Sequence, residues 1–222
     1  MRLTLFDLDG TLLPGDSDHA FGEFLVREGI ADGERFRQRN DAFYADYQAG
    51  RLDIAAYIDF ITEDWRERPS ADLEALSARY LQTVIRPMLR LQAAGLVERH
   101  RAAGDRIAII TATNDFITRP IAAMFGVPTL IATELERDAS GRPTGAIRGV
   151  PAFREGKIVR VEDWLQGLGL RLGDFERSTF YSDSTNDLPL LERVSHPVAT
   201  NPAPALERIA GERGWPVLRL FP

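Results

Sequence analysis

Two pairs of aspartates stand out because their residue type and spacing suit chemistry on an anion. Asp7 and Asp9 follow a short apolar segment, in the order Asp7-Leu-Asp-Gly-Thr11. Two residues apart on an extended chain, their side chains point to the same side. Two anions held this close need a cation or a shared proton, and Mg²⁺ is the abundant ion with a preference for oxygen ligands. The alternative is an Asp-Gly turn after a strand, with no catalytic role.

The second pair, Asp183 and Asp187, also follows an apolar segment. Asp183 lies at a predicted strand end and Asp187 one helical turn later, so both carboxylates face one side of a strand-to-helix junction. Helix capping is the alternative, because Asp, Ser and Asn are favoured at helix starts. Capping accounts for one of these residues, but not for an acidic pair opposite another acidic pair.

Weaker features could hold the oxygens of an anion. Thr111 and Asn114 join a strand end to a helix start, where a hydroxyl and free amides meet, although a simple cap is the commoner reason for such residues. Lys157 is the only lysine of the chain. It lies at the start of a predicted helix, where a positive charge opposes the helix dipole. The alternative to a functional role is chance placement on a solvated helix face. Thr11 and Asn186 lie beside the acidic pairs and are candidates for phosphate or substrate contact.

Apolar segments and helical patterns alternate over most of the chain, as in proteins with a parallel sheet. The predicted strands are 2–8, 106–110, 129–133, 179–182, 197–200 and 217–220. After the first strand, apolar spacings of three and four predict four amphipathic helices over 17–29, 34–50, 53–65 and 70–85. A projecting hairpin is predicted over 133–138 and 144–148.

We therefore expect an α/β, Rossmann-like, three-layer fold with a parallel sheet and one inserted all-helical cap. Residues 1–14 and 87–222 would form the core, and residues 15–86 the cap. In open parallel sheets the site lies outside the carboxyl ends of the strands. These ends carry Asp7, Thr111 and Asp183, and the cap leaves the chain at the same edge.

Composition excludes several classes of protein. The 222 residues include 27 basic and 33 acidic ones, a net charge of −6, which argues against general binding to nucleic acid or an anionic membrane. The chain has no cysteine, which excludes thiol nucleophiles, thiolate metal sites and disulfides. No apolar run approaches the roughly 18 residues of a membrane span, and the first residues do not resemble a signal peptide. We expect a cytoplasmic protein.

Taken in order, the motifs resemble those of the haloacid dehalogenase superfamily of phosphohydrolases over nearly the whole chain. Asp7-Leu-Asp-Gly-Thr11 is similar to the first motif, Thr111 to the second, Lys157 to the third, and Asp183 with Asp187 to the fourth. A helical cap between the first two motifs resembles the phosphoserine phosphatase-like branch, subfamily IB. Four segments are similar to its histidinol-phosphatase-like group: Gly15–Ser17, Phe43–Gly50, Gly141–Gly145 and Asp187–Leu191.

This resemblance implies a Mg²⁺-dependent phosphatase that hydrolyses a small-metabolite phosphomonoester through an aspartyl-phosphate. Asp7 would be the nucleophile, and Asp9 would protonate the leaving alkoxide and then deprotonate water. Mg²⁺ would be held by Asp7, the backbone carbonyl of Asp9 and Asp183, while Asp187 supports this shell or Lys157.

The resemblance also assigns Thr111 and Lys157 to the remaining phosphoryl oxygens. Two other functions stay open: a phosphotransferase on the same site, and a phosphate-binding regulatory protein without turnover. The cap should choose the substrate. One of four residues at its start could bind an amine, although a solvated helix start is their commoner role; these are Asp16, Asp18, His19 and Glu23.

Overall fold

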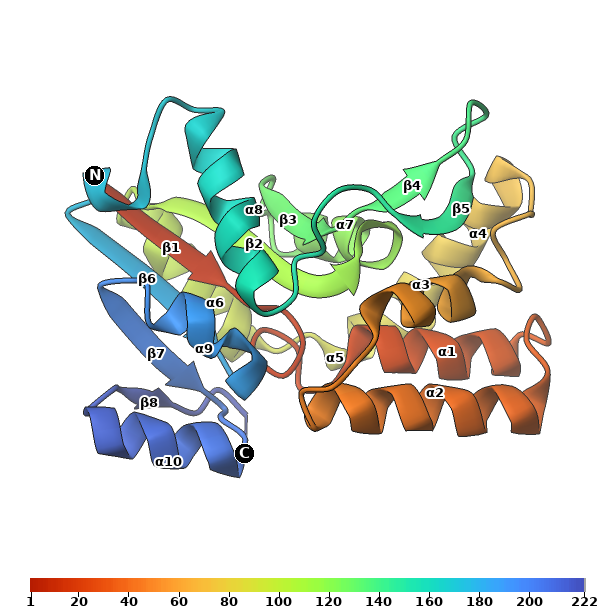
Figure 1. The fold of residues 1–222 in the computed structure, drawn as a ribbon, viewed down its shortest axis with the longest axis horizontal. Coiled ribbons are helices and arrows are strands. Elements are labelled where there is room, and N and C mark those ends of the chain that lie inside the picture. The colour runs from red at the N-terminus through yellow and green to blue at the C-terminus, as the bar shows by residue number, and fades with distance from the viewer. Residues whose placement is uncertain (222) are drawn as a thin grey trace.

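The computed structural model describes residues 1–221, in which six strands form one parallel sheet in the order β3-β2-β1-β6-β7-β8 (Figure 1). Each of the six predicted strand segments contributes one strand, so the expected α/β class is confirmed. The strands are β1 (Arg2–Phe6), β2 (Arg106–Asn114), β3 (Leu130–Thr133), β6 (Arg177–Ser182), β7 (His196–Thr200) and β8 (Val217–Leu218).

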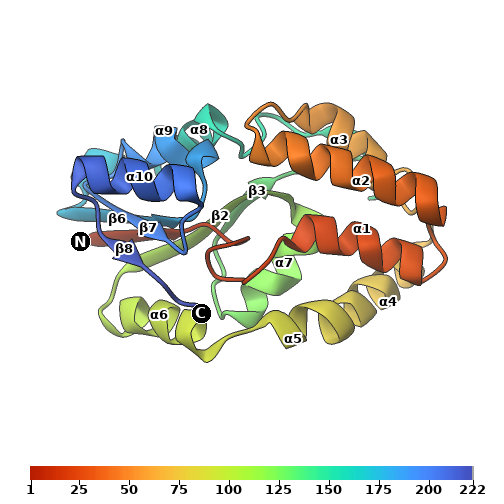
Figure 2. The same cartoon turned by 90° about the horizontal axis from the view of Figure 1, so that it is seen from below.

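Helices cover both faces of this sheet and make three layers (Figure 2). Along β1, Leu3 and Leu5 pack toward one set of helices and Phe6 toward the other, because successive side chains of a strand point to opposite faces. Burial on both faces explains why the middle of β2 is a continuous apolar run of Ala108, Ile109 and Ile110. The first set is α8 (Glu155–Gln166), α9 (Leu188–Leu191) and α10 (Pro204–Arg213); the second is α6 (Leu91–Ala102) and α7 (Asp115–Met124).

The part of the chain between β1 and α6 is mostly helical and lies to one side of the sheet (Figure 1). Its last predicted helix, 70–85, does not stay regular: α4 gives way to a π-helical turn over Leu81–Ile85 and then to α5 (Arg86–Met88). Pro87 is the physical reason, because it lacks an N–H and its ring crowds the carbonyl four residues earlier. The longer helices are α1 (Ser17–Arg27), α2 (Gly33–Gln48), α3 (Ile54–Thr62) and α4 (Ser70–Tyr80).

These helices share one hydrophobic cluster with the sheet domain. Trp65, which is fully buried, stacks on Phe116 of α7 with ring centroids 4.4 Å apart, and Phe21 of α1 lies 6.1 Å from Phe116. The cap that we propose over residues 15–86 is therefore packed onto the core by aromatic contacts. Among residues 1–221, no helix is long and apolar enough to cross a membrane.

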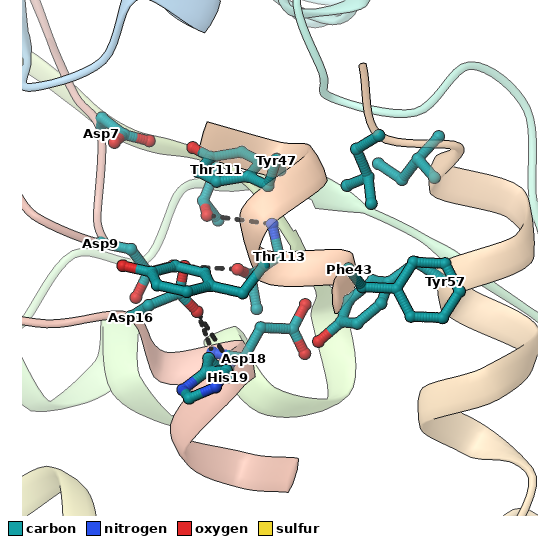
Figure 3. Close-up of a pocket in the computed structure, with 14 residues that line it drawn as sticks. Asp7, Asp9, Asp16, Asp18, His19, Phe43, Tyr47, Tyr57, Thr111 and Thr113 are labelled. Carbon is teal, nitrogen blue, oxygen red and sulfur yellow. Dashed lines mark hydrogen bonds between the residues drawn. The ribbon is translucent and has the colours of Figure 1, made fainter. Parts of the chain in front are cut away.

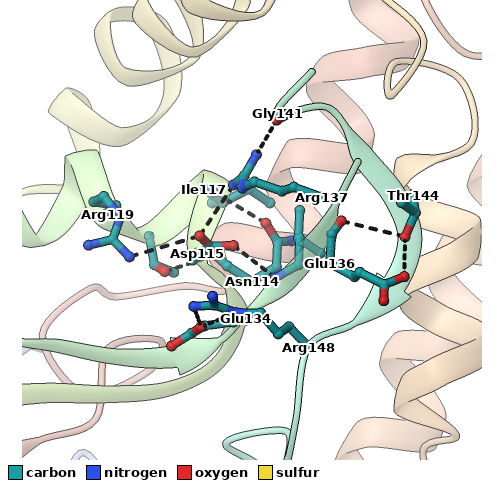
Figure 4. A network of polar contacts seen from close by, with 12 residues as sticks. Asn114, Asp115, Ile117, Arg119, Glu134, Glu136, Arg137, Gly141, Thr144 and Arg148 are labelled. Atoms are coloured by element: carbon teal, nitrogen blue, oxygen red, sulfur yellow. Dashed lines mark hydrogen bonds and ion pairs between the residues drawn. The ribbon is translucent and has the colours of Figure 1, made fainter. Parts of the chain in front are cut away.

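The predicted hairpin forms from β4 (Leu135–Arg137) and β5 (Pro143–Ile147), and it packs against α3 instead of projecting freely. Asp115 anchors it to the start of α7 (Figure 4): one carboxylate oxygen accepts the Leu135 N–H at 3.0 Å, and the other lies 3.2 Å from the Arg137 guanidinium. The cap surface thus includes a hairpin from outside 15–86.

Candidate active site

The chain turns sharply directly after β1. The N–H of Asp7 still donates to the carbonyl of Tyr181 in β6, at 2.9 Å, so the Asp7 side chain starts where the sheet ends. The Leu8 carbonyl then accepts the N–H groups of Thr11, Leu12 and Leu13. This tight turn holds Asp7 and Asp9 at the carboxyl edge of the central strand.

A buried lysine joins two of the predicted aspartates. Lys157 of α8 is 2% exposed, and its Nζ lies 2.9 Å from Asp7 Oδ1 and 2.7 Å from Asp187 Oδ1. The Ser182 hydroxyl donates to Asp187 Oδ2 at 2.7 Å. Burial alone would lower the pKa of Lys157, but Asp187 and Asp7 together raise it, so the amine stays charged.

The carboxyl groups of Asp7 and Asp9 differ in their surroundings. Burial raises the pKa of Asp7 to about 6; Lys157 opposes this rise and Asp187 adds to it. Asp9 has no cationic partner among residues 1–221: Oδ1 accepts the Ser17 N–H at 2.7 Å and Oδ2 accepts the Thr113 hydroxyl at 2.9 Å. Burial, with the nearby charge of Asp16, raises the pKa of Asp9 to about 8. Asp9 is therefore suited to carry a proton near neutral pH.

Asp183 follows β6 and lies against the turn after β1. Its Oδ1 accepts the Thr11 hydroxyl at 3.1 Å, and burial, reinforced by Asp7 and Asp187, raises its pKa well above the usual value. Gly10 makes this close approach possible. Its φ is +70°, and a Cβ there would lie 2.2 Å from Asp183 Oδ2.

We expect Gly10→Ala to lower both stability and activity. The positive φ alone costs about 1–2 kcal/mol for a residue with a Cβ, and the methyl group must also displace the Asp183 carboxylate. Gly104→Ala is a matched control, because Gly104 has a φ of +75° but open space around it. Urea unfolding and phosphatase assays of both variants test this expectation; equal losses in the two would show that the Asp183 contact is unimportant.

One pocket contains several of these side chains (Figure 3). Asp7, Asp9 and Thr111 line it together with cap residues. Thr111 is 1% exposed, and its hydroxyl oxygen accepts the N–H of Thr113 at 3.2 Å. β2 runs to Asn114, not to Ile110 as predicted, because Asn114 pairs with Thr133 of β3. Thr111 and Thr113 therefore belong to the strand end.

The arrangement fits a cation held by few protein side chains. Within residues 1–221, no three His, Cys, Asp or Glu side chains are grouped to hold a metal. Asp187, predicted to support the metal shell or Lys157, contacts Lys157 and Ser182. The side chains of Lys157 and Thr11 contact only Oδ1 of Asp7 and Oδ1 of Asp183, and a cation would offset the mutual repulsion of these two carboxylates. Carboxylate and carbonyl oxygens are the donors that Mg²⁺ prefers.

The family model for haloacid dehalogenase-like hydrolases matches residues 4–192. The chain belongs to this family. The membership predicted from the motifs is thus confirmed, and the protein is an enzyme of the hydrolase class. The matched range includes the turn after β1, Thr111, Lys157 and both members of the second acidic pair.

Several known proteins resemble the chain over nearly its whole length. It is 42% identical to a histidinol-phosphatase of Neisseria meningitidis over 98% of both chains. A crystal structure of a protein of unknown function from Bordetella pertussis is 51% identical, with a TM-score of 0.93 over 99% of both chains. A phospho-aspartyl intermediate analogue of phosphoserine phosphatase is 16% identical, with a TM-score of 0.69 over 99% of this chain and 93% of the other, and shares the fold.

Three residues predicted to contact substrate have other partners in this hydrolase. The Thr11 hydroxyl donates to Asp183, and Asn114 caps α7 by accepting the Ile117 N–H at 3.3 Å. The Asn186 amide donates to the Tyr47 carbonyl of α2 at 2.9 Å. None of the three lines the pocket. Asn186 thus joins the core to the cap, a contact that sequence spacing cannot indicate.

The acidic residues at the start of the cap differ from the expected solvated helix start. Asp16 caps α1 through the N–H groups of Asp18 and His19, and all three line the pocket. Asp18 is only 7% exposed. Glu23 comes nearer to the expectation, since it is half-buried, does not line the pocket and lies 3.1 Å from the Arg37 guanidinium.

Sequence reasoning missed two positioning residues. Asn201, with φ +44°, donates to the carbonyls of Gly10 and Thr11 and accepts the Leu220 N–H at 2.6 Å, so it braces the turn after β1. Arg154, with φ +52°, donates to the Gly50 carbonyl of the cap at 2.9 Å. Neither residue belongs to a sequence motif, and only the positive φ angles seen in the structure distinguish them from other residues.

Proposed function

We propose that this protein is a Mg²⁺-dependent phosphatase of small-metabolite phosphomonoesters. The observation that carries the proposal is the buried Asp7–Lys157–Asp187 bridge, with a second carboxyl group of raised pKa, Asp9, in the same pocket as Asp7. An ionised carboxylate beside a protonated one is the arrangement that nucleophilic and acid–base steps require. A relative named histidinol-phosphatase, 42% identical, supports the same reaction class.

The proposed reaction uses both carboxyl groups in turn. An Asp7 oxygen attacks phosphorus and forms a new O–P bond while the ester O–P bond breaks, and Asp9 gives its proton to the leaving alkoxide. Asp9 then takes a proton from a water molecule that attacks the same phosphorus. The acyl phosphate breaks, which regenerates Asp7 and releases inorganic phosphate.

The other residues of the site orient the reacting groups and offset the negative charge of the phosphoryl group. Lys157 fixes one oxygen of Asp7 and thereby orients the carboxylate. Thr111 lies in the pocket beside Asp7 and can donate its hydroxyl to a phosphoryl oxygen. Asp7, Asp183 and the carbonyl of Asp9 would hold Mg²⁺, which when bound neutralises charge on the phosphoryl oxygens. The cytoplasm as its location remains a prediction from the sequence.

A substrate screen with and without metal tests this proposal. We expect phosphate release from at least one member of a panel of phosphorylated amino acids, amino alcohols, sugars and nucleotides in Mg²⁺, and a loss of more than about a hundredfold when EDTA removes the ion. Phosphoryl transfer to an added alcohol in preference to water would favour a phosphotransferase. Binding of phosphate without turnover of any substrate would favour a regulatory protein.

A further inference from the structure

A second groove begins at the edge of the sheet opposite the acidic one. Arg2 and Arg177 are the first residues of β1 and β6 and are register partners, so they lie at the amino ends of the strands that Asp7 and Asp183 follow. In Figure 2 the N-terminus, where β1 starts, lies far from the cap helices α1 and α2. The groove has a volume of about 500 Å³, which is within the range of small-molecule sites. It shares no lining residue with the pocket that contains Asp7.

The groove lies between α6 and β8 on one face of the sheet. Tyr181 of β6 and Val198 of β7 are register partners, and both belong to the hydrophobic cluster on the α6 side, so they form the floor of the groove. α6 supplies one wall and β8 the other. Part of the lining is apolar and can cover the hydrocarbon part of a ligand; it consists of Leu96, Val198, Pro216, Val217 and Leu218.

The polar part of the lining is basic. It contains three arginines, Arg2, Arg99 and Arg177, and one acid, Asp105. The Arg2 Nε lies 2.8 Å from Asp105 Oδ1, so these two charges are paired. Arg99 and Arg177 are exposed, and within residues 1–221 their guanidinium groups form no hydrogen bond and no ion pair. In a chain with a net charge of −6, the groove is therefore locally positive.

Both of these arginines lie near the hydroxyl group of Tyr181. Burial raises the pKa of Tyr181, and the charges of Arg177 and Arg99 oppose this rise. Because the two side chains come from different elements, β6 and α6, they can approach one ligand from two sides.

A hydrogen-bonded network fixes the groove behind these arginines. Asp105 Oδ2 lies 2.6 Å from His100 Nδ1 and accepts the Thr4 hydroxyl at 3.0 Å. His100 Nε2 lies 2.8 Å from the Tyr181 hydroxyl, and Tyr181 stacks on Phe6 with ring centroids 5.0 Å apart. The one acid of the groove is thus occupied within the protein and leaves the two exposed arginines for a ligand. A floor fixed in this way loses little conformational freedom when a ligand binds.

We propose that this groove is a second ligand site, which binds a small organic anion. Arg99 and Arg177 bind its phosphate or carboxylate group, because guanidinium groups donate paired N–H bonds to such oxyanions. The apolar residues of β7 and β8 cover the rest of the ligand. The site is separate from the active site, and the proposal does not depend on the proposed phosphatase function.

Titration calorimetry with phenylphosphonate tests this proposal on the unaltered protein. The probe has a C–P bond in place of a phosphoester bond, so a phosphatase does not consume it. EDTA is present, because without a metal ion the acidic residues around Asp7 repel anions. We expect phenylphosphonate to bind at least about tenfold more tightly than benzyl alcohol, which has the ring without the charge, and about fivefold more tightly than inorganic phosphate, which lacks the ring. Phenylacetate, titrated in parallel, shows whether a carboxylate is preferred to a phosphate-like group.

A double variant assigns the binding to the groove. In Arg99→Gln/Arg177→Gln the Kd for phenylphosphonate should rise at least about tenfold. Phosphatase activity should not change, because neither residue lines the pocket that contains Asp7. Arg35→Gln, at another exposed arginine on α2, is the matched control and should bind the probe like wild type. Thermal unfolding checks that both variants are folded.

The opposite results would overturn the proposal. Equal affinity of wild type and the folded double variant for phenylphosphonate would place the binding elsewhere. Equal affinity for benzyl alcohol and phenylphosphonate would show that the arginines do not select an anion, and equal affinity for inorganic phosphate would show that the apolar lining has no role. Failure of both phenylphosphonate and phenylacetate to bind at about 10 mM would exclude the site.

Discussion

Asp7→Asn is expected to lower phosphate release by about 10⁴-fold or more, because the amide cannot form the acyl phosphate. Stability should change little. The amide oxygen of Asn can still accept from Lys157, and Lys157 keeps its contacts of 2.7 and 2.8 Å with Asp187. The substitution also removes one negative charge from an acid-rich site, which offsets part of the lost ion pair.

Acid-quenched samples distinguish this role of Asp7 from a merely structural one. Wild-type enzyme mixed with substrate should yield a peptide containing Asp7 that carries one additional phosphoryl group, and the variant should not. Asp163 is an exposed acid on α8, so Asp163→Asn is the control for the change from aspartate to asparagine. A folded Asp7→Asn variant within tenfold of the wild-type rate would contradict the assignment of the nucleophile.

Lys157→Met is expected to cost about 3–5 kcal/mol of unfolding free energy, as well as activity, because it leaves two buried carboxylates without their shared cation. Methionine preserves most of the apolar length of the side chain, so packing changes little. Urea unfolding at neutral pH measures the loss. The double variant Lys157→Met/Asp187→Asn should recover part of it, since only one unpaired carboxylate then remains.

The loss in Lys157→Met should depend on pH in a defined direction. Burial raises the pKa of Asp7 to about 6 even beside the lysine, and without the lysine it should rise further. A group whose folded pKa exceeds its unfolded value binds protons in the folded state, so stability falls as pH rises from about 4 through the folded pKa. The deficit relative to wild type should therefore be smaller at pH 5 than at pH 8; a deficit independent of pH would contradict this account.

Much of the fold was predictable because the main signals are local. Apolar strands alternate with helical patterns, and both faces of a parallel sheet must be covered, so six strand segments and three layers follow from the sequence. The irregular part of the cap was not predictable in the same way. Whether Pro87 ends a helix or widens it into a π-turn depends on how the next residues pack, which no periodicity records.

The same division holds for the site residues. Asp7 and Asp183 follow strands and Thr111 lies near the end of one. Because parallel strands end at one edge, the approach of these residues to one another follows from order alone. Their partners do not follow from order. The Thr11 hydroxyl binds Asp183 and the Asn186 amide binds the Tyr47 carbonyl, because the turn after β1 and the end of α2 bring these groups within hydrogen-bond distance.

The sequence by itself therefore determined the fold class, the family and the acidic edge of the sheet, because strand order and motif spacing are properties of the chain. Tertiary structure alone decided which aspartates have a cationic partner. Lys157 lies between Asp7 and Asp187, whereas Asp18 lines a pocket together with aromatic residues and forms no ion pair within residues 1–221. Burial and partner distance set the free energy of a charge, and both depend on residues that are far apart in the chain.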